Sequence, residues 1–169
     1  MYDKDVKIFL GGPAGAGKTA LSEFLVTRGW NSLDMDRKGT NRVLELLDAP
    51  AEHPDFQKFP LVLEGGFLEE AVRFQRLINR LDLTTFWLTG SKSQLIDSRL
   101  RRMAHWDKVN EIRNSDWIGL IERYRTHVRW NYQIQMWHPD GKRKSFEQVL
   151  YEIESCVLTG THLSAPENY

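Results

Sequence analysis

The sequence has one cysteine, Cys156, so an intrachain disulfide is impossible and a thiolate zinc cluster is disfavoured. It also lacks any apolar run near the roughly 18 residues that span a bilayer. The opening Met1-Tyr2-Asp3-Lys4-Asp5 is too polar for a signal peptide. We therefore expect a cytoplasmic protein with no membrane partner.

Net charge is absent as well, because 23 lysines and arginines balance 23 aspartates and glutamates. This balance argues against a wholly basic nucleic-acid binder. The charge is nevertheless unevenly distributed. Residues 1–98 carry 12 basic and 14 acidic side chains, residues 99–144 carry 11 and 5, and residues 145–169 carry none and 4. A local surface for a polyanion therefore remains possible within 99–144.

Short apolar runs alternate with amphipathic segments over the 169 residues, a length that predicts one domain. Strands are expected at 6–10, 30–33, 61–63, 83–88 and 134–137. Helices are expected at 19–28, 41–48, 68–80, 91–104, about 117–128 and 145–157. The alternation predicts an α/β three-layer sandwich with a five-stranded parallel sheet, whose ligands lie beyond the carboxyl ends of the strands. We expect the domain to cover 1–160 and a flexible tail to cover 161–169.

The first strand runs into a glycine-rich segment that matches G-x-x-x-x-G-K-[ST] at every fixed position: Gly12-Pro13-Ala14-Gly15-Ala16-Gly17-Lys18-Thr19. Glycines allow successive backbone N–H groups to converge on an anion, and the following helix adds partial positive charge. Lys18 is expected to reach the outer phosphates as a catalytic residue, and the Thr19 hydroxyl to hold magnesium. Nucleotide binding is assigned to Gly12, Ala14, Gly15, Ala16, Gly17, Lys18 and Thr19.

With this loop, residues 6 to about 157 resemble the small P-loop kinases: shikimate and gluconate kinases, nucleoside monophosphate kinases, and the kinase domain of polynucleotide kinases. The resemblance implies an adenylate kinase-like P-loop fold with a helical lid, and ATP and Mg²⁺ as cofactors. By the same analogy, the turn at 138–144 is similar to the family's loop that passes the adenine of ATP.

Asp34-Met35-Asp36 follows the second expected strand and resembles the Asp-x-Asp of shikimate-type kinases. Alternate residues of an extended segment face the same way, so both carboxylates can point into one cleft. Phosphorylating a hydroxyl needs a carboxylate to orient the oxygen and accept its proton. The resemblance places Asp34 nearer the metal and Asp36 nearer the acceptor. The alternative is a capped, solvated turn.

Glu64-Gly65-Gly66 follows the third expected strand. Glu64 departs from the family pattern, and it could bind magnesium through water, act as the base, or cap the next helix. Gly65 and Gly66 would let an acceptor approach the backbone. Arg37, Lys38 and Arg42 are either anchors for an anionic acceptor or ordinary surface charges.

The basic block at 99–144 contains the region that the resemblance identifies as a lid, at about 100–116. The guanidinium groups of lid arginines would stabilise the negative charge on the oxygens of the transferring phosphoryl group, and the closed lid would exclude water. Arg102 and Arg113 are assigned to catalysis on this basis, and Arg99 to the nucleotide. Each could instead belong to a solvated helix face.

Four tryptophans fall in this block. Trp117 and Tyr124 lie on an apolar helical stripe and are interpreted as core. Trp106, Trp130 and His105 lie off the stripe among cations, where an exposed ring could stack on a nucleobase.

The function predicted from these features is ATP- and Mg²⁺-dependent transfer of a γ-phosphate to a hydroxyl of an anionic or nucleotide-like acceptor. That hydroxyl could belong to DNA or to a modified base, as in polynucleotide kinases or phage base modification. Alternatives are a nucleoside monophosphate kinase, a small-metabolite kinase, and a non-catalytic ATP-binding switch. No stable protein partner is implied.

Overall fold

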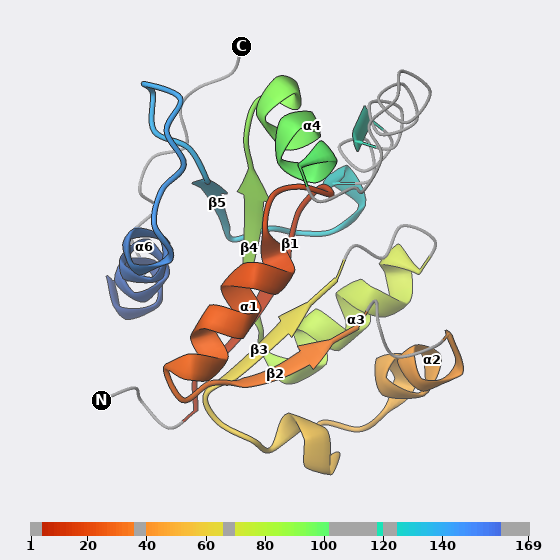
Figure 1. The fold of residues 1–169 in the computed structure, drawn as a ribbon. Coiled ribbons are helices and arrows are strands. Elements are labelled where there is room, and N and C mark those ends of the chain that lie inside the picture. Colours follow the sequence, from red (N-terminus) through yellow and green to blue (C-terminus); the bar gives the residue numbers. More distant parts are fainter. Residues whose placement is uncertain (1–4, 36–39, 66–69, 102–117, 120–124, 160–169) are drawn as a thin grey trace.

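Five short strands form one parallel sheet in the computed structural model of the chain (Figure 1). In sheet order they are β2 (Asn31–Asp34), β3 (Leu61–Glu64), β1 (Lys7–Gly11), β4 (Thr84–Thr89) and β5 (Tyr132–Gln135). Each neighbouring pair is parallel. The order jumps from one side of β1 to the other after β3, so the carboxyl end of β1 lies at the switch point where ligands bind in such sheets. The predicted fold class is confirmed.

The structure describes residues 5–35, 40–65, 70–101, 118–119 and 125–159, with only the backbone for 40–42. The described helices are α1 (Lys18–Thr27), α2 (Thr40–Asp48), α3 (Ala71–Leu81), α4 (Lys92–Leu100) and α6 (Phe146–Thr159). Two short 3₁₀ segments, η1 (Pro54–Phe56) and η2 (Arg125–His127), lie in connections. No helix within these ranges has the length and apolar character of a membrane span.

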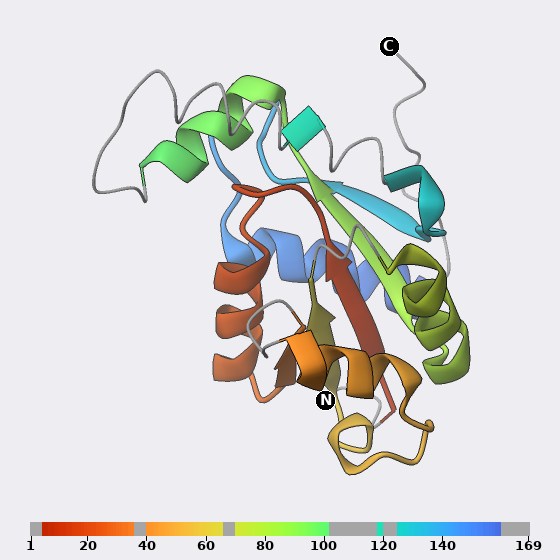
Figure 2. The ribbon, with the colours of Figure 1, turned by 90° about the vertical axis from the view of Figure 1, so that its right-hand side faces the viewer.

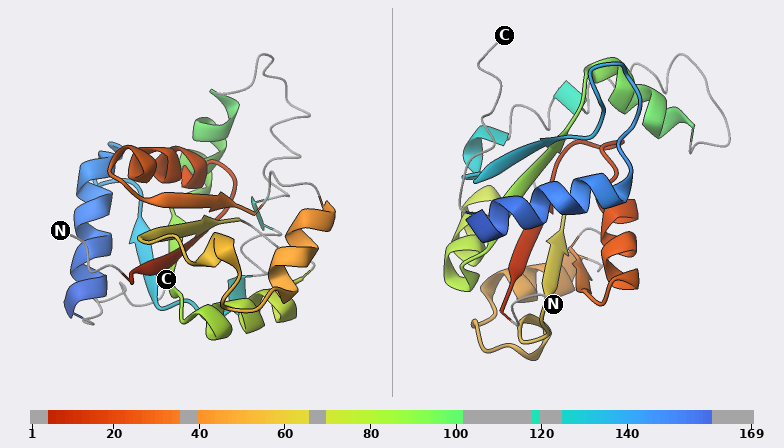
Figure 3. Two further views of the ribbon diagram at one scale, coloured as in Figure 1. Left: turned by 90° about the horizontal axis from the view of Figure 1, so that it is seen from below. Right: turned by 90° about the vertical axis from the view of Figure 1, so that its left-hand side faces the viewer.

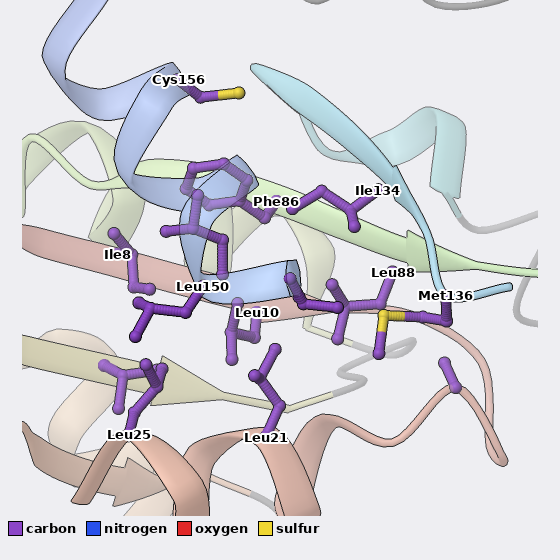
Figure 4. Close-up of a cluster of buried hydrophobic side chains, with 14 of the residues drawn as sticks. Ile8, Leu10, Leu21, Leu25, Phe86, Leu88, Ile134, Met136, Leu150 and Cys156 are labelled. Carbon is purple, nitrogen blue, oxygen red and sulfur yellow. The ribbon is translucent and has the colours of Figure 1, made fainter. Parts of the chain in front are cut away.

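Helices cover both faces of the sheet and make three layers (Figures 1 and 3). On one face, Leu21 and Leu25 of α1 and Leu150 of α6 pack against Ile8 and Leu10 of β1 (Figure 4). On the other face, α2 and α3 pack against the odd-numbered side chains of β1, β2 and β3. Successive strand residues point to opposite faces, so the even-numbered residues Leu10, Asp34 and Glu64 all face α1.

α4 lies beyond the carboxyl end of β4, above the loop that joins β1 to α1 (Figures 1 and 2). Ser91 caps it as predicted: its hydroxyl accepts from the backbone N–H of Gln94, while its own N–H donates to the Gln94 side chain at 2.9 Å. This capping box satisfies two N–H groups that the helix leaves unpaired. α4 is thereby positioned over the predicted phosphate loop.

Several predicted boundaries differ from the structure. β5 begins and ends two residues before the predicted 134–137, because Tyr132 pairs with Phe86 and Gln135 with Thr89, where β4 ends. Beyond that point Trp137 forms an antiparallel bridge with Arg143 across a turn. α4 ends at Leu100 instead of about 104, and α3 begins at Ala71 instead of 68.

Other expectations meet the described residues only in part. Of the helix expected at about 117–128, the structure describes residues 118–119 and 125–128, and the latter include the 3₁₀ segment η2. The lid expected at about 100–116 and the tail at 161–169 lie outside the described residues, apart from Leu100 and Arg101.

Candidate active site

The loop from Gly12 to Gly17 joins the carboxyl end of β1 to the amino end of α1. Gly15 has φ +90° and Gly17 has φ +97°, with Ala16 between them. Left-handed residues on both sides of an ordinary one turn successive N–H groups toward the same side, which makes a concave anion site. The loop borders a cavity of about 260 Å³ lined by Ala14, Gly15, Gly17, Lys18, Thr19 and Arg99.

Two predicted nucleotide-binding residues support this loop without lining the cavity. Ala16 is fully buried in the core between α1 and the sheet. Gly12 lies against β4, where a Cβ atom would be 2.4 Å from the carbonyl oxygen of Leu88. The side of the loop that faces away from the cavity therefore packs against the core and β4, and the opposite side faces the cavity.

Lys18 and Thr19 begin α1 at the cavity. The Lys18 ammonium donates to the carbonyl oxygens of Gly12 at 2.7 Å and Pro13 at 3.3 Å, so its side chain folds back over the loop. The Thr19 hydroxyl lies near the Glu64 carboxylate and acts to lower the pKa of that group. Both residues line the 260 Å³ cavity, and their assignments to phosphate and metal stay predictions.

Asp34 and Glu64 are direct neighbours at the ends of β2 and β3. Adjacent strands lie about 4.8 Å apart, and opposite residues of a parallel pair point to the same face. That face is the one covered by α1, which carries Thr19. Two carboxylates therefore lie side by side behind the phosphate loop, although they are 30 positions apart in the sequence.

Glu64 is only 4% exposed. Burial raises the pKa of its carboxyl group; hydrogen bonds from Thr19 and Ser22 partly oppose this rise, while the charge of Asp34 adds to it. Ser22 is fully buried, and its hydroxyl also lies 2.6 Å from that of Ser32. α3 begins at Ala71 with Glu70 at the cap position, so Glu64 does not cap that helix.

Several predicted site residues lie outside the described residues: Asp36, Arg37, Lys38, Gly66, Arg102 and Arg113. For Arg42 the backbone lies in α2 and the side chain is not described. Gly65 is described, and its N–H donates to the Leu10 carbonyl oxygen at 3.3 Å. Arg99 lines the 260 Å³ cavity, and its assignment to the nucleotide stays a prediction.

A second cavity, of about 390 Å³, lies between α4 and the turn that follows β5. Its lining includes Ser98 of α4 and Arg101, the residue that follows α4, together with Trp137, Gly141 and Arg143 of the turn. The turn is held by backbone hydrogen bonds from Gly141 to His138 at 2.9 Å and from His138 to Lys142 at 2.8 Å. This turn is the one at 138–144 that, by the resemblance, is predicted to pass the adenine of ATP.

Arg143, which was not singled out from the sequence, lines the second cavity and contacts the phosphate loop. Its guanidinium donates to the carbonyl oxygen of Ala16 at 3.1 Å and to the Ser98 hydroxyl at 2.9 Å, and it lies 5.1 Å from the centre of the Trp137 ring. Only its position beside the turn could have drawn attention to it. Ser22 was also missed, although a polar residue on the apolar face of α1 is a usable signal.

The interpretation of Trp130 as an exposed stacking surface was wrong. Its ring lies 5.5 Å from that of Phe9 and 4.8 Å from that of Trp87, and its indole N–H donates to the Arg125 carbonyl oxygen at 3.0 Å. A Cβ atom on Gly11 would lie 2.1 Å from the same ring. Trp130 therefore fills space against β1. His105, Trp106, Trp117 and Tyr124 lie outside the described residues.

The sequence matches no protein-family model and no curated protein sequence. Solved structures do match. A shikimate kinase from Acinetobacter baumannii in complex with shikimate has a TM-score of 0.61 at 20% identity, over 94% of this chain and 96% of its own. A gluconokinase from Sinorhizobium meliloti 1021 has a TM-score of 0.53 at 13% identity, over 95% and 100%.

The YorR protein from Bacillus subtilis, in complex with phosphorylated GDP, has a TM-score of 0.57 at 12% identity, over 93% of this chain and 99% of its own. The chain has the fold of the small P-loop kinases. The predicted resemblance is thus confirmed at the level of the fold. Within this kinase fold, the phosphate loop, the paired carboxylates and the cavity beside α4 occupy one end of the sheet.

Proposed function

We propose that this protein is a kinase that uses ATP and Mg²⁺ to phosphorylate a hydroxyl of a small anionic acceptor. The observation that carries the proposal is the placement of Asp34 and Glu64, which lie side by side next to a phosphate loop with an intact lysine and threonine. A loop of this kind binds a nucleoside triphosphate, and carboxylates beside it suit metal binding and proton transfer.

The oxygen atoms at this site fit magnesium. Asp34 and Glu64 offer carboxylate oxygens and Thr19 offers a hydroxyl, which are the hard donors that Mg²⁺ prefers. Two adjacent carboxylates, one of them buried, repel each other when both are ionised, and a divalent cation relieves that repulsion. Thr19 and Asp34 would hold the ion, with Glu64 acting through water. When bound, Mg²⁺ neutralises charge on the β- and γ-phosphates.

The transfer step follows from this arrangement. The acceptor hydroxyl oxygen forms a bond to the γ-phosphorus, the bond from that phosphorus to the β–γ bridging oxygen breaks, and ADP leaves with the electron pair. The hydroxyl proton passes to the Asp36 carboxylate, which we assign as the base from the resemblance of Asp34-Met35-Asp36 to the Asp-x-Asp of shikimate-type kinases. Lys18 and Arg99 stabilise the phosphoryl oxygens, and Arg102 and Arg113 are assigned to the same charge.

We assign the triphosphate to the 260 Å³ cavity and its base to the 390 Å³ cavity. A small acceptor is favoured over DNA. Shikimate, bound to the shikimate kinase with this fold, is a small molecule. Trp130, one of the aromatics that suggested a nucleobase, is packed against β1.

The test is a transfer screen with γ-labelled ATP and Mg²⁺ against shikimate-like acids, sugars, nucleosides, nucleoside monophosphates, and DNA with and without hydroxymethylated bases. Labelling of a small hydroxylated acid or sugar supports the proposal. Labelling of nucleoside monophosphates to diphosphates favours a monophosphate kinase instead, and salt-sensitive labelling of DNA favours a polynucleotide acceptor. Asp36→Asn is expected to abolish acceptor labelling while ATP binding persists, and retained labelling would remove Asp36 as the base.

A further inference from the structure

Arg143 makes three different contacts from the turn after β5. One guanidinium nitrogen donates to the Ala16 carbonyl oxygen at 3.1 Å, another donates to the Ser98 hydroxyl at 2.9 Å, and the plane lies over Trp137. The side chain therefore connects the phosphate loop, α4 and the turn, which are far apart in the sequence. The planar guanidinium group of arginine has several donors in fixed directions and can make all three contacts at once, whereas the compact ammonium group of lysine cannot.

The contact with Ala16 has a consequence for phosphate binding. The carbonyl of Ala16 and the N–H of Gly17 belong to one planar trans peptide unit, in which the two bonds point in opposite directions. Because the Ala16 carbonyl is held toward Arg143, the Gly17 N–H is held away from it. Gly17 lines the phosphate cavity. A cation on the carbonyl side also polarises the peptide, which strengthens the N–H as a donor.

Close packing on its neighbours restricts the Arg143 guanidinium to this position. A Cβ atom on Gly17 would lie 2.1 Å from an Arg143 nitrogen, so the glycine is needed for this approach as well as for its positive φ. Trp137, on which the guanidinium lies, packs so closely on Gly90 that a Cβ there would be 2.4 Å from the ring. The residues on either side of the turn are tied by the Lys144 N–H, which donates to the Met136 carbonyl oxygen at 3.0 Å.

We propose that Arg143 is a positioning residue that orients the Ala16–Gly17 peptide of the phosphate loop. A residue that lines the 390 Å³ cavity, which we assign to the nucleobase, would then also determine the affinity for phosphate. The proposal rests on the proposed function, since it assigns the phosphate loop to a triphosphate. This role differs from simple contact with the nucleobase of ATP in one measurable consequence. Removing the Arg143 side chain should weaken the binding of a phosphate ligand that carries no nucleobase.

The experiment compares inorganic tripolyphosphate with ATP, both with Mg²⁺, by isothermal titration calorimetry. Arg143→Ala is expected to weaken both ligands by roughly tenfold, the scale of one charge-assisted hydrogen bond. Weaker binding of ATP with unchanged binding of tripolyphosphate overturns the proposal, because Arg143 would then act on the base alone. If the wild type binds neither ligand, the proposed function itself fails, which is a separate result.

Two further variants separate position from charge. Lys142→Ala removes a neighbouring cation whose side chain is 83% exposed and which pairs with Asp140 at 3.5 Å, so it is expected to change tripolyphosphate binding less than about twofold. Arg143→Lys keeps the charge and loses the fork, so most of the Arg143→Ala defect is expected to remain. Full recovery with lysine, or an equal defect in Lys142→Ala, would show that only charge matters. Far-UV circular dichroism shows whether Arg143→Ala folds. If it does not fold, Arg143→Lys replaces it in the comparison of tripolyphosphate with ATP.

Discussion

Replacing Glu64 with glutamine is the change whose effect can be followed most directly from the structure. The carboxyl group is 4% exposed, and burial raises its pKa, with hydrogen bonds from Thr19 and Ser22 opposing the rise and the charge of Asp34 adding to it. Glutamine has nearly the same shape and no charge. In the metal-free protein it removes the cost of holding an ionised group in this position.

The sign of the effect follows from proton linkage. Below the ordinary glutamate pKa of 4.5, the carboxyl is protonated in both the folded and the unfolded chain, and the difference between wild type and variant is constant. Above it, the unfolded chain loses the proton first, so the free energy of unfolding of the wild type falls relative to Glu64→Gln. One proton limits this slope to about 1.4 kcal/mol per pH unit. Above the raised pKa of Glu64 the difference is constant again.

The assay is urea unfolding of both proteins from pH 4 to 8 in the presence of a chelator. Glu147→Gln is the matched control, because its carboxylate is 62% exposed and its pair with Arg28 at 3.5 Å lies at the surface, where such pairs contribute little. A difference between wild type and Glu64→Gln that does not change with pH would refute the reasoning. So would a wild type that gains stability over the variant as pH rises.

Three further variants test the loop and its supports. Lys18→Ala is expected to lower transfer from γ-labelled ATP by at least about a hundredfold, because phosphoryl charge loses a cation; unchanged turnover would remove Lys18 from the mechanism. Gly90→Ala places a Cβ 2.4 Å from Trp137, on which the Arg143 guanidinium lies, and is expected to weaken tripolyphosphate as well as ATP in calorimetry; unchanged tripolyphosphate binding would contradict the coupling through Arg143. Gly11→Ala places a Cβ 2.1 Å from Trp130, and overpacking of this kind costs about 1–3 kcal/mol, which thermal unfolding would detect. A melting temperature equal to wild type would contradict that packing.

Much of the fold was predictable because its determinants are local. The apolar runs at 6–10 and 61–63 and the cap at Ser91 depend on neighbours in sequence, and the structure has β1, β3 and α4 there. The end of β5 was misplaced because it is set by where β4 stops, at Thr89, and not by the sequence that continues through Met136 and Trp137. Trp130 was misinterpreted for a related reason. Its spacing gave no sign that Gly11 leaves room for an indole on β1.

The candidate site divides in the same way. The sequence alone determined the phosphate loop, because eight consecutive residues carry its glycines, lysine and threonine. It also indicated that Asp34 and Glu64 follow strands, because Glu64 closes the apolar run Leu61-Val62-Leu63 and Asp34 follows the expected strand at 30–33. Only the tertiary structure decided that these carboxylates are neighbours, that Glu64 is buried, and that Arg143 lies against Ala16, 127 positions away. Strand order and the path of the turn after β5 decide such contacts, and both are set by packing between distant segments, which leaves no local pattern in the chain.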